Sequence, residues 1–194
     1  MTLPSVTAIV LAGGRSRRFG RDKLAEPLAG RPLLLHAIEA VSVIASDVIV
    51  VARPGAMLDL PTGARLVHDP TAHEGPLAGL LAGLLEAREP LIVLVGGDMP
   101  SLDPVVLAAL VRALDASSAD LAVLEHRGRR QPLPMALRNG AATTHARRLI
   151  GDGERRLGAI LDRLAVRVLA EGEWRPLDPD ATTLRDVDVP DDLP

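Results

Sequence analysis

Apolar residues along the chain follow two alternating patterns. Short runs rich in β-branched and aliphatic residues predict strands, and the longer segments between them have apolar residues at helical spacing. The predicted strands are Thr7–Leu11, Asp47–Ala52, Arg65–His68, Leu91–Val95, Asp120–Leu124 and Pro134–Arg138. The predicted helices are Pro32–Ile44, Pro76–Ala87, Pro104–Leu114, Ala141–Ile150 and Glu154–Leu164, and the first three open with proline, which the first helical turn tolerates. This alternation predicts an α/β domain with a mostly parallel sheet.

Two of the predicted strands, Ala8–Leu11 and Leu91–Val95, are apolar throughout, as expected of central strands that helices cover on both faces. We therefore expect a three-layer α/β/α, Rossmann-like fold that takes residues 1–194 as a single domain, with ligands at the carboxyl ends of the strands. The segment Glu171–Pro194 is rich in proline and aspartate. It is expected to be irregular, with one short strand near Leu184–Val187.

Composition excludes several classes of function. The chain has no cysteine, so disulfides, thiolate nucleophiles and cysteine-bound zinc are excluded. A net charge of −3 and two aromatic residues, Phe19 and Trp174, argue against a nucleic-acid-binding module. No apolar stretch reaches the length of a membrane span, and the N-terminus lacks the pattern of a signal peptide. A cytoplasmic protein with no membrane partner is the expectation.

The first predicted strand leads into a loop of glycines and arginines, AGGRSRRFGRDK, at residues 12–23. Glycine lets the backbone approach a ligand, and arginine offers forked donors that match phosphate oxygens. Of 22 positive residues, Lys23 is the single lysine. The spacing fits neither common phosphate-binding fingerprint. The composition indicates a phosphate-binding loop, and the alternative is a solvated basic turn.

A second candidate follows the apolar run Leu91–Val95, where Asp98 stands in the sequence GGDMP. A carboxylate at the end of a buried strand suits Mg²⁺, which takes oxygen ligands and shares them with substrate phosphates. The alternative is an N-cap or turn aspartate. A third element, Asp186-Val187-Asp188, offers alternating carboxylates that an extended chain would point to one face.

Together these motifs resemble the molybdenum cofactor guanylyltransferase (MobA-type) family of nucleotidyltransferases. The resemblance spans nearly the whole chain: LAGG to DK at residues 11–23, HD at 68–69, GPLAG at 75–79, GDMP at 97–100, and the terminal D-x-D-x-P. Where the family often has asparagines in the last motif, this chain has Asp186 and Asp188, a form similar to related cytidylyltransferases. An asparagine common after the second strand corresponds to a position near Arg53.

The resemblance implies a nucleotidyltransferase fold and a set of site residues. It implies that Arg18, Lys23 and Asp98 are catalytic and that Asp98 and Asp188 hold Mg²⁺. It also implies nucleotide contacts from the first loop and from the region after the third strand, at Leu11, Ala12, Gly13, Gly14, Arg15, Lys23, Asp69, Pro76, Leu77, Ala78 and Gly79. The implied reaction is attack by the phosphate of molybdopterin on the α-phosphorus of GTP, with release of pyrophosphate. Transient contact with other cofactor-assembly proteins is a further expectation.

Several alternatives stay open at this level. A relative of the same fold could use CTP, or act on phospholactate or a sugar phosphate. The chain could also bind nucleotide without catalysis. His68-Asp69 alone would be compatible with a metal-dependent phosphohydrolase. Arg127-Gly128-Arg129-Arg130 is expected to form an exposed hairpin or loop, either touching the phosphate of the acceptor or simply solvated.

Overall fold

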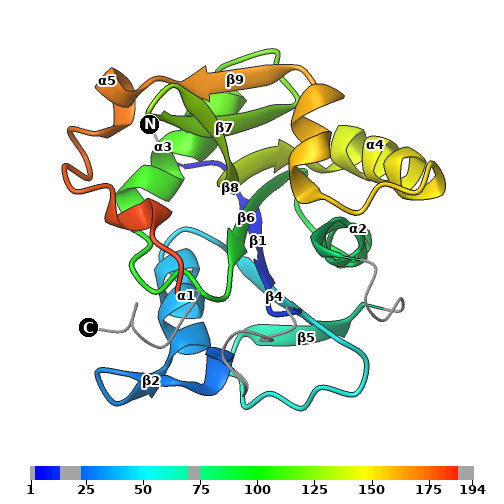
Figure 1. Cartoon of the computed structure of the whole chain (residues 1–194), viewed down its shortest axis with the longest axis vertical. Helices are drawn as coiled ribbons and strands as arrows, with labels where there is room; N and C mark the ends of the chain where they lie inside the picture. Colours follow the sequence, from blue (N-terminus) through cyan, green and yellow to red (C-terminus); the bar gives the residue numbers. More distant parts are fainter. Residues whose placement is uncertain (1–2, 14–22, 70–74, 188–194) are drawn as a thin grey trace.

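The computed structural model describes residues 3–13, 23–69 and 75–187, and its centre is a seven-stranded sheet (Figure 1). The strand order is β5-β4-β1-β6-β8-β7-β9, and β8 alone runs antiparallel to its neighbours in the sheet. The strands are β1 (Val6–Leu11), β4 (Asp47–Ala52), β5 (Ala64–His68), β6 (Leu91–Gly96), β7 (Leu121–His126), β8 (Arg129–Arg138) and β9 (Val166–Leu169). The expected mostly parallel sheet is confirmed. A separate hairpin joins β2 (Pro27–Leu28) to β3 (Arg31–Pro32).

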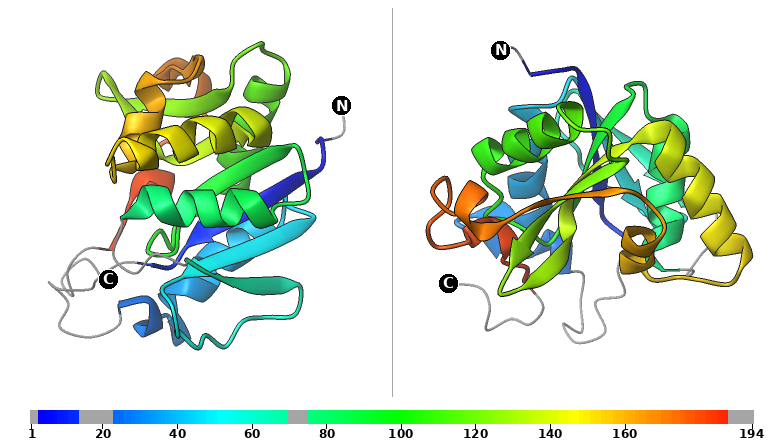
Figure 2. Two further views of the ribbon diagram at one scale, coloured as in Figure 1. Left: turned by 90° about the vertical axis from the view of Figure 1, so that its right-hand side faces the viewer. Right: turned by 90° about the horizontal axis from the view of Figure 1, so that it is seen from above.

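Helices cover both faces of this sheet (Figures 1 and 2). One face carries α1 (Leu33–Ser42), α3 (Pro104–Asp115) and the short α5 (Glu171–Trp174), and the other carries α2 (Pro76–Glu86) and α4 (Asn139–Gly151). The described residues also form three 3-10 turns: η1 (Lys23–Ala25), η2 (Leu157–Asp162) and η3 (Thr182–Leu184). Among the described residues, no helix is both long enough and apolar enough to span a membrane.

The core lies in two layers, one on each side of the sheet. Along β1, Val6, Ala8 and Val10 belong to the layer under α1 and α3, whereas Ile9 belongs to the layer under α2 and α4. All four side chains are fully buried. Because successive strand residues point to opposite faces, a strand covered on both sides is mostly apolar, and a polar residue in it, such as Thr7, needs hydrogen-bond partners. The uninterrupted apolar runs in the sequence therefore mark the central strands correctly.

Two glycines allow α2 to lie close against β1. A Cβ on Gly83 would stand 2.8 Å from Ile9 Cγ2, and one on Gly79 would stand 3.3 Å from Leu11 Cδ2. Glycine inside a helix costs about 1 kcal/mol relative to alanine. Burial of β1 against the helix offsets that cost, so Gly79 has a packing role.

Several elements differ from the sequence-based expectation. Glu154–Leu164 is not a helix: the Glu154 carboxylate accepts from the amides of Arg155 (2.8 Å) and Arg156 (2.9 Å), which makes a turn, and only the 3-10 segment η2 follows. No strand forms at Leu184–Val187, where η3 leads into chain without regular structure. Strand β9 was not predicted, because its sequence, VRVL, is too short to stand out from its surroundings.

The arginine-rich turn after β7 is a hairpin, as expected. Arg127 (φ 51°) and Gly128 (φ 70°) both adopt the left-handed conformation between β7 and β8. Two such residues are what a tight two-residue hairpin turn requires. Strand β8 consequently begins at Arg129, earlier than the predicted Pro134.

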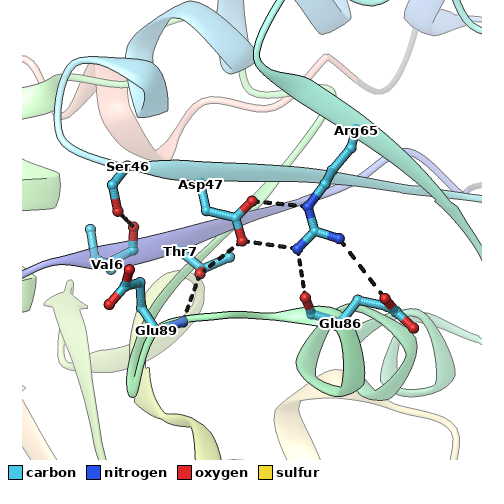
Figure 3. Close-up of polar contacts among 7 residues, drawn as sticks. All are labelled: Val6, Thr7, Ser46, Asp47, Arg65, Glu86 and Glu89. Atoms are coloured by element: carbon cyan, nitrogen blue, oxygen red, sulfur yellow. Dashed lines mark hydrogen bonds and ion pairs between the residues drawn. The ribbon is translucent and has the colours of Figure 1, made fainter.

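A partly buried ion pair ties together the amino-terminal ends of the strands (Figure 3). Arg65 donates from Nε to Asp47 Oδ1 (2.9 Å) and from Nη2 to Asp47 Oδ2 (2.9 Å), and Thr7 donates to the same carboxylate at 3.1 Å. The Arg65 guanidinium holds the pKa of Asp47 below its usual range, although burial acts in the opposite direction. This network lies at the edge of the sheet opposite the carboxyl ends of β1 and β6.

We expect Arg65→Ala to lower the free energy of unfolding by about 2 kcal/mol at neutral pH, because it strips a buried carboxylate of charge-assisted hydrogen bonds. A lowered pKa gives stability above the unfolded-state value of about 4 and loses it as the pH falls through the folded-state value. The difference between wild type and variant should therefore shrink in acid. Urea unfolding followed by the fluorescence of Trp174 measures the difference in stability between wild type and variant at pH 7 and at pH 3. Arg147→Ala, which removes an exposed arginine of α4, is the control and should change stability little at either pH.

Candidate nucleotide site

The carboxyl ends of β1, β4 and β6 meet at one edge of the sheet, where backbone hydrogen bonds fix the segments that follow. The Ala12 amide donates to the Val51 carbonyl (2.7 Å), and the Gly97 amide donates to the Leu11 carbonyl (2.9 Å). Gly13 lies beside Arg53: a Cβ on the glycine would be 3.8 Å from the Arg53 amide nitrogen. The start of the glycine loop and the loop carrying Asp98 are therefore held next to each other.

Lys23 and Asp98 meet at this edge although 75 residues separate them in the sequence. Lys23 Nζ lies 2.6 Å from Asp98 Oδ2 and donates a second hydrogen bond to the Val187 carbonyl at 3.0 Å. The side chains are 14% and 26% exposed, so the pair is accessible yet partly desolvated. The end of the glycine loop and the GGDMP carboxylate therefore meet at the carboxyl ends of the strands, the edge at which the sequence places a ligand.

Local packing explains how Lys23 is placed. It opens η1, in which Leu24 is buried against the core layer that contains α1. The Leu33 amide, at the start of α1, donates to the Glu26 carbonyl at 3.0 Å. The segment after the lysine is thus anchored, and the lysine side chain is directed from a fixed backbone.

Asp98 is a turn residue, not a helix cap. The N-cap of α3 is Asp103, whose Oδ1 accepts from the Val105 amide at 2.7 Å. The Asp98 carboxylate folds back over Gly96, where a Cβ would stand 2.4 Å from Asp98 Oδ1. The neighbouring Gly97 is also confined, with 3.2 Å between a would-be Cβ and the Leu11 carbonyl oxygen. Both glycines leave room that the turn needs, a role that the sequence motif did not disclose.

Val187 brings the C-terminal segment to the same place, where the resemblance implies Asp188, although the part played by Val187 itself was not predicted. Its amide donates to the Asp98 carbonyl at 3.0 Å, its carbonyl accepts from Lys23, and its side chain is 4% exposed and packs on Leu33. A single valine in an irregular tail carries no sequence signal. Asp188 follows it directly but lies outside the described residues, as do Gly14, Arg15 and Arg18.

The GPLAG segment forms the start of α2, and its side chains are divided between surface and core. Pro76 is exposed, while Leu77, Ala78 and Gly79 are buried. Leu77 is fully buried in the core layer under α2, so contact of its side chain with a ligand is excluded. Any contribution of these three residues to ligand binding would have to come from backbone groups.

The turn before α2 rests on a neighbour that the sequence did not predict. Gly75 has φ 88°, and a Cβ there would lie 2.7 Å from the Arg155 carbonyl oxygen, which also accepts from the Leu77 amide at 3.4 Å. Only glycine fits this approach without strain. The segment that was expected to be helical therefore supports the start of α2.

Asp69 follows β5 and donates its amide to the Ala52 carbonyl at 2.9 Å, so it also stands at the edge that carries Lys23 and Asp98. The adjacent His68 is engaged elsewhere: its Nε2 lies 3.0 Å from the Ala56 carbonyl oxygen. Within the described ranges, no group of three or more His, Asp or Glu side chains is arranged to hold a metal ion. The residues described here give no support to a phosphohydrolase centre around His68.

Asp98 fits Mg²⁺ better than it fits a metal that needs a full protein cage. Mg²⁺ commonly uses one or two carboxylates and completes its shell with water and substrate phosphate. Asp98 offers a partly exposed carboxylate at the end of a central strand, beside a lysine that suits phosphate. This arrangement of donors is compatible with an ion that is shared with a polyphosphate.

Comparison with known proteins agrees with this geometry. Residues 8–168 match the model of the MobA-like NTP transferase domain. The probable molybdenum cofactor guanylyltransferase of Chloroflexus aggregans is 36% identical, over 97% of this chain and 91% of that protein. The molybdenum cofactor guanylyltransferase of Burkholderia vietnamiensis is 40% identical, over 80% of this chain and 81% of that protein.

A solved structure shows the same architecture. Molybdopterin-guanine dinucleotide biosynthesis protein A from Archaeoglobus fulgidus superposes with a TM-score of 0.80 at 26% identity, covering 96% of this chain and 94% of that one. The related sequences and the solved structure each cover 80% or more of this chain. The chain therefore belongs to the family of MobA-like NTP transferase domains.

Proposed function

We propose that this protein is a molybdenum cofactor guanylyltransferase, which transfers GMP from GTP to the phosphate of molybdopterin and releases pyrophosphate. The observation that carries the proposal is the meeting of Lys23 with Asp98, at 2.6 Å, at the edge where the glycine loop begins. The names of relatives at 36% and 40% identity support guanylyl transfer as the reaction. We also propose that residues 1–194 form one domain. A protein that uses GTP as donor is expected to act in the cytoplasm.

The site residues would have different roles in such a reaction. Asp98, with Asp188, would hold Mg²⁺, which supplies charge neutralisation at the phosphates. Lys23, Arg15, Arg18 and the amides of Gly13 and Gly14 would bind the triphosphate. Asp69 and the start of α2 at Pro76 would stand near the nucleoside. Transient contact with other cofactor-assembly proteins remains part of the proposal.

The reaction needs positioning more than acid–base catalysis. A phosphate monoester has a second pKa of about 6, so the acceptor is largely dianionic at neutral pH and can attack without a general base. Two of the five histidines, His36 and His68, bond to backbone carbonyls of Leu28 and Ala56. Charge neutralisation and alignment of the reacting groups are the tasks left to the protein.

Backbone groups of the residues after β1 would recognise the base of the nucleotide. The Leu11 carbonyl and the Ala12 amide already bond to Gly97 and Val51. The Ala12 carbonyl and the Gly13 amide come next and would present one acceptor and one donor to a base edge. Guanine offers a complementary pair in N1–H and O6, and cytosine offers one in N4–H and N3, so measurement with both nucleotides decides between them.

A panel of nucleoside triphosphates tests the proposal. With molybdopterin as acceptor, pyrophosphate release should be fastest with GTP. Faster release with CTP would favour the cytidylyltransferase alternative, which Asp186 and Asp188 keep open. Binding of GTP without turnover would favour a non-catalytic partner in cofactor assembly, and turnover only with phospholactate or a sugar phosphate would change the acceptor.

Gly96→Ala tests whether the position of the Asp98 carboxylate matters. A Cβ at residue 96 would stand 2.4 Å from Asp98 Oδ1, so the carboxylate must rotate away. Misplacing a catalytic group by about 1 Å can cost on the order of 100-fold in rate, and we expect a loss of about tenfold or more. GMP transfer measured at saturating GTP gives the answer. Gly140→Ala, where a Cβ meets nothing within 4 Å, is the matched control and should keep full activity.

A further inference from the structure

The residues from Trp174 to Val187 form a segment, here called the C-terminal strap, that lies along the loop between β6 and α3. Trp174 anchors one end: it is fully buried and donates from Nε1 to the Glu125 carbonyl at 2.9 Å. Val187 anchors the other end, with its side chain buried against Leu33. In Figure 1 this segment runs from α5 back toward α1, on the same face of the sheet as α3.

Asp178 organises the middle of the strap. Its side chain is buried, and the residue is 5% exposed. Asp178 Oδ1 accepts from the amide and the hydroxyl of Thr182, both at 3.0 Å, and Oδ2 accepts from the Thr183 amide at 2.8 Å. The carboxylate thereby satisfies the first amides of η3, as a cap does for a helix.

Thr183 connects this turn to the loop that carries Asp98. It is fully buried, and its hydroxyl oxygen accepts from the Asp103 amide at 3.0 Å. Asp103 is the N-cap of α3 and ends the loop that begins at Gly97. The strap is therefore bonded to the end of the loop through Thr183 and to its start through Val187.

The strap also positions the side chain of Lys23. The Val187 carbonyl accepts from Lys23 Nζ at 3.0 Å, while the Val187 amide donates to the Asp98 carbonyl at 3.0 Å. One residue of the strap thus contacts both members of the Lys23–Asp98 pair. A shift of the strap must change how the ammonium faces the carboxylate.

We infer that Asp178 and Thr183 are positioning residues for nucleotidyl transfer, which act through Val187 on the geometry of the Lys23–Asp98 pair. The inference rests on the proposed function. Neither residue touches the pair directly; the hydrogen bonds of η3 and the backbone of residues 184–187 link them to it. Their loss should change the alignment of the site and leave the core layers packed.

Thr183→Val is the main test, because it removes the hydroxyl while keeping the shape of the side chain. Thr7→Val is the matched control: Thr7 is also fully buried, and its hydroxyl bonds to Asp47 and to the Glu89 amide at the opposite edge of the sheet. Thr183→Ser restores the hydroxyl. Each variant is assayed for kcat and KM of GMP transfer under conditions where Trp174 fluorescence shows it folded.

We expect Thr183→Val to lower kcat about tenfold, Thr183→Ser to keep a kcat close to that of wild type, and Thr7→Val to lose stability with kcat unchanged. Equal kcat in the two valine variants would overturn the inference. If Thr183→Val does not fold, Asp178→Asn takes its place with the same expectation for kcat.

A second readout does not depend on activity. Lys23 is the only lysine, so protein labelled at lysine Cε gives one NMR signal for the site. The chemical shift of that signal should change in Thr183→Val and stay unchanged in Thr7→Val. An unmoved signal in Thr183→Val contradicts the inference even if wild type transfers no GMP, whereas absence of transfer by wild type with a moved signal contradicts only the proposed function.

Discussion

Asp98→Ala should reduce GMP transfer by on the order of 100-fold to 1,000-fold, the size expected when a group that stabilises developing charge is removed. The carboxylate is the described side chain best placed to hold Mg²⁺, and it is 26% exposed, so its removal leaves no large cavity. Stability should change by about 1 kcal/mol or less. Pyrophosphate release at saturating GTP and Mg²⁺, together with unfolding followed by Trp174, measures both effects.

Asp115→Ala is the matched control for this prediction. Asp115 is an exposed carboxylate at the last residue of α3, at the end of the helix away from the β6 loop. The variant should transfer GMP at the wild-type rate. Full activity of Asp98→Ala at ordinary Mg²⁺ would refute the role of the carboxylate, and equal loss in both variants would point to a general effect of lost negative charge.

The sequence predicts the central part of the fold well because burial on two faces leaves little choice of residue. A strand such as β6, LIVLVG, is buried at every position, so a polar side chain there would cost stability unless it found a hydrogen-bond partner. Helices α2 and α3 begin at Pro76 and Pro104, as predicted, since proline suits the first helical turn and ends what precedes it. These are local rules, and they place local elements.

Local rules fail where side chains replace regular backbone bonding. At residues 154–156 the Glu154 carboxylate takes the amides that a helix would leave open at its start, and its pKa falls to about 2 chiefly because Arg156 donates to it. At residues 178–183 the Asp178 carboxylate does the same for η3. The apolar spacing in the first segment is real, yet it fits the 3-10 turn of η2 as well as a helix.

In the candidate site, too, some features could be predicted from the sequence and others could not. That Asp98 and the glycine loop face each other follows from parallel strands ending at one edge, so the sequence could predict it. The contribution of Val187 could not be predicted, because it acts through its amide and carbonyl, which every residue type possesses. Gly96 is visible as a glycine, but only the structure shows that its missing Cβ makes room for a carboxylate oxygen.

Lys23→Ala should weaken GTP binding about tenfold to 100-fold, because a hydrogen bond from an ammonium to a charged acceptor is worth about 1.5–3 kcal/mol. Lys23 stands 2.6 Å from Asp98, so the variant also removes the counter-charge of that carboxylate. Comparing the two variants separates the roles. Without Mg²⁺, calorimetry should show weak GTP binding for Lys23→Ala and wild-type binding for Asp98→Ala, since in the proposed function the lysine, unlike Asp98, would contact phosphate directly.

With Mg²⁺ present, both variants should bind GTP more weakly than wild type, because the proposed ion would link Asp98 to the phosphates and the lysine would bind phosphate itself. Arg112→Ala removes an exposed positive charge near the far end of α3 and controls for the change in net charge. GTP affinity of Lys23→Ala equal to that of Arg112→Ala in both conditions would mean that Lys23 only neutralises Asp98. The triphosphate would then have to be held by the arginines of the glycine loop without help from the lysine.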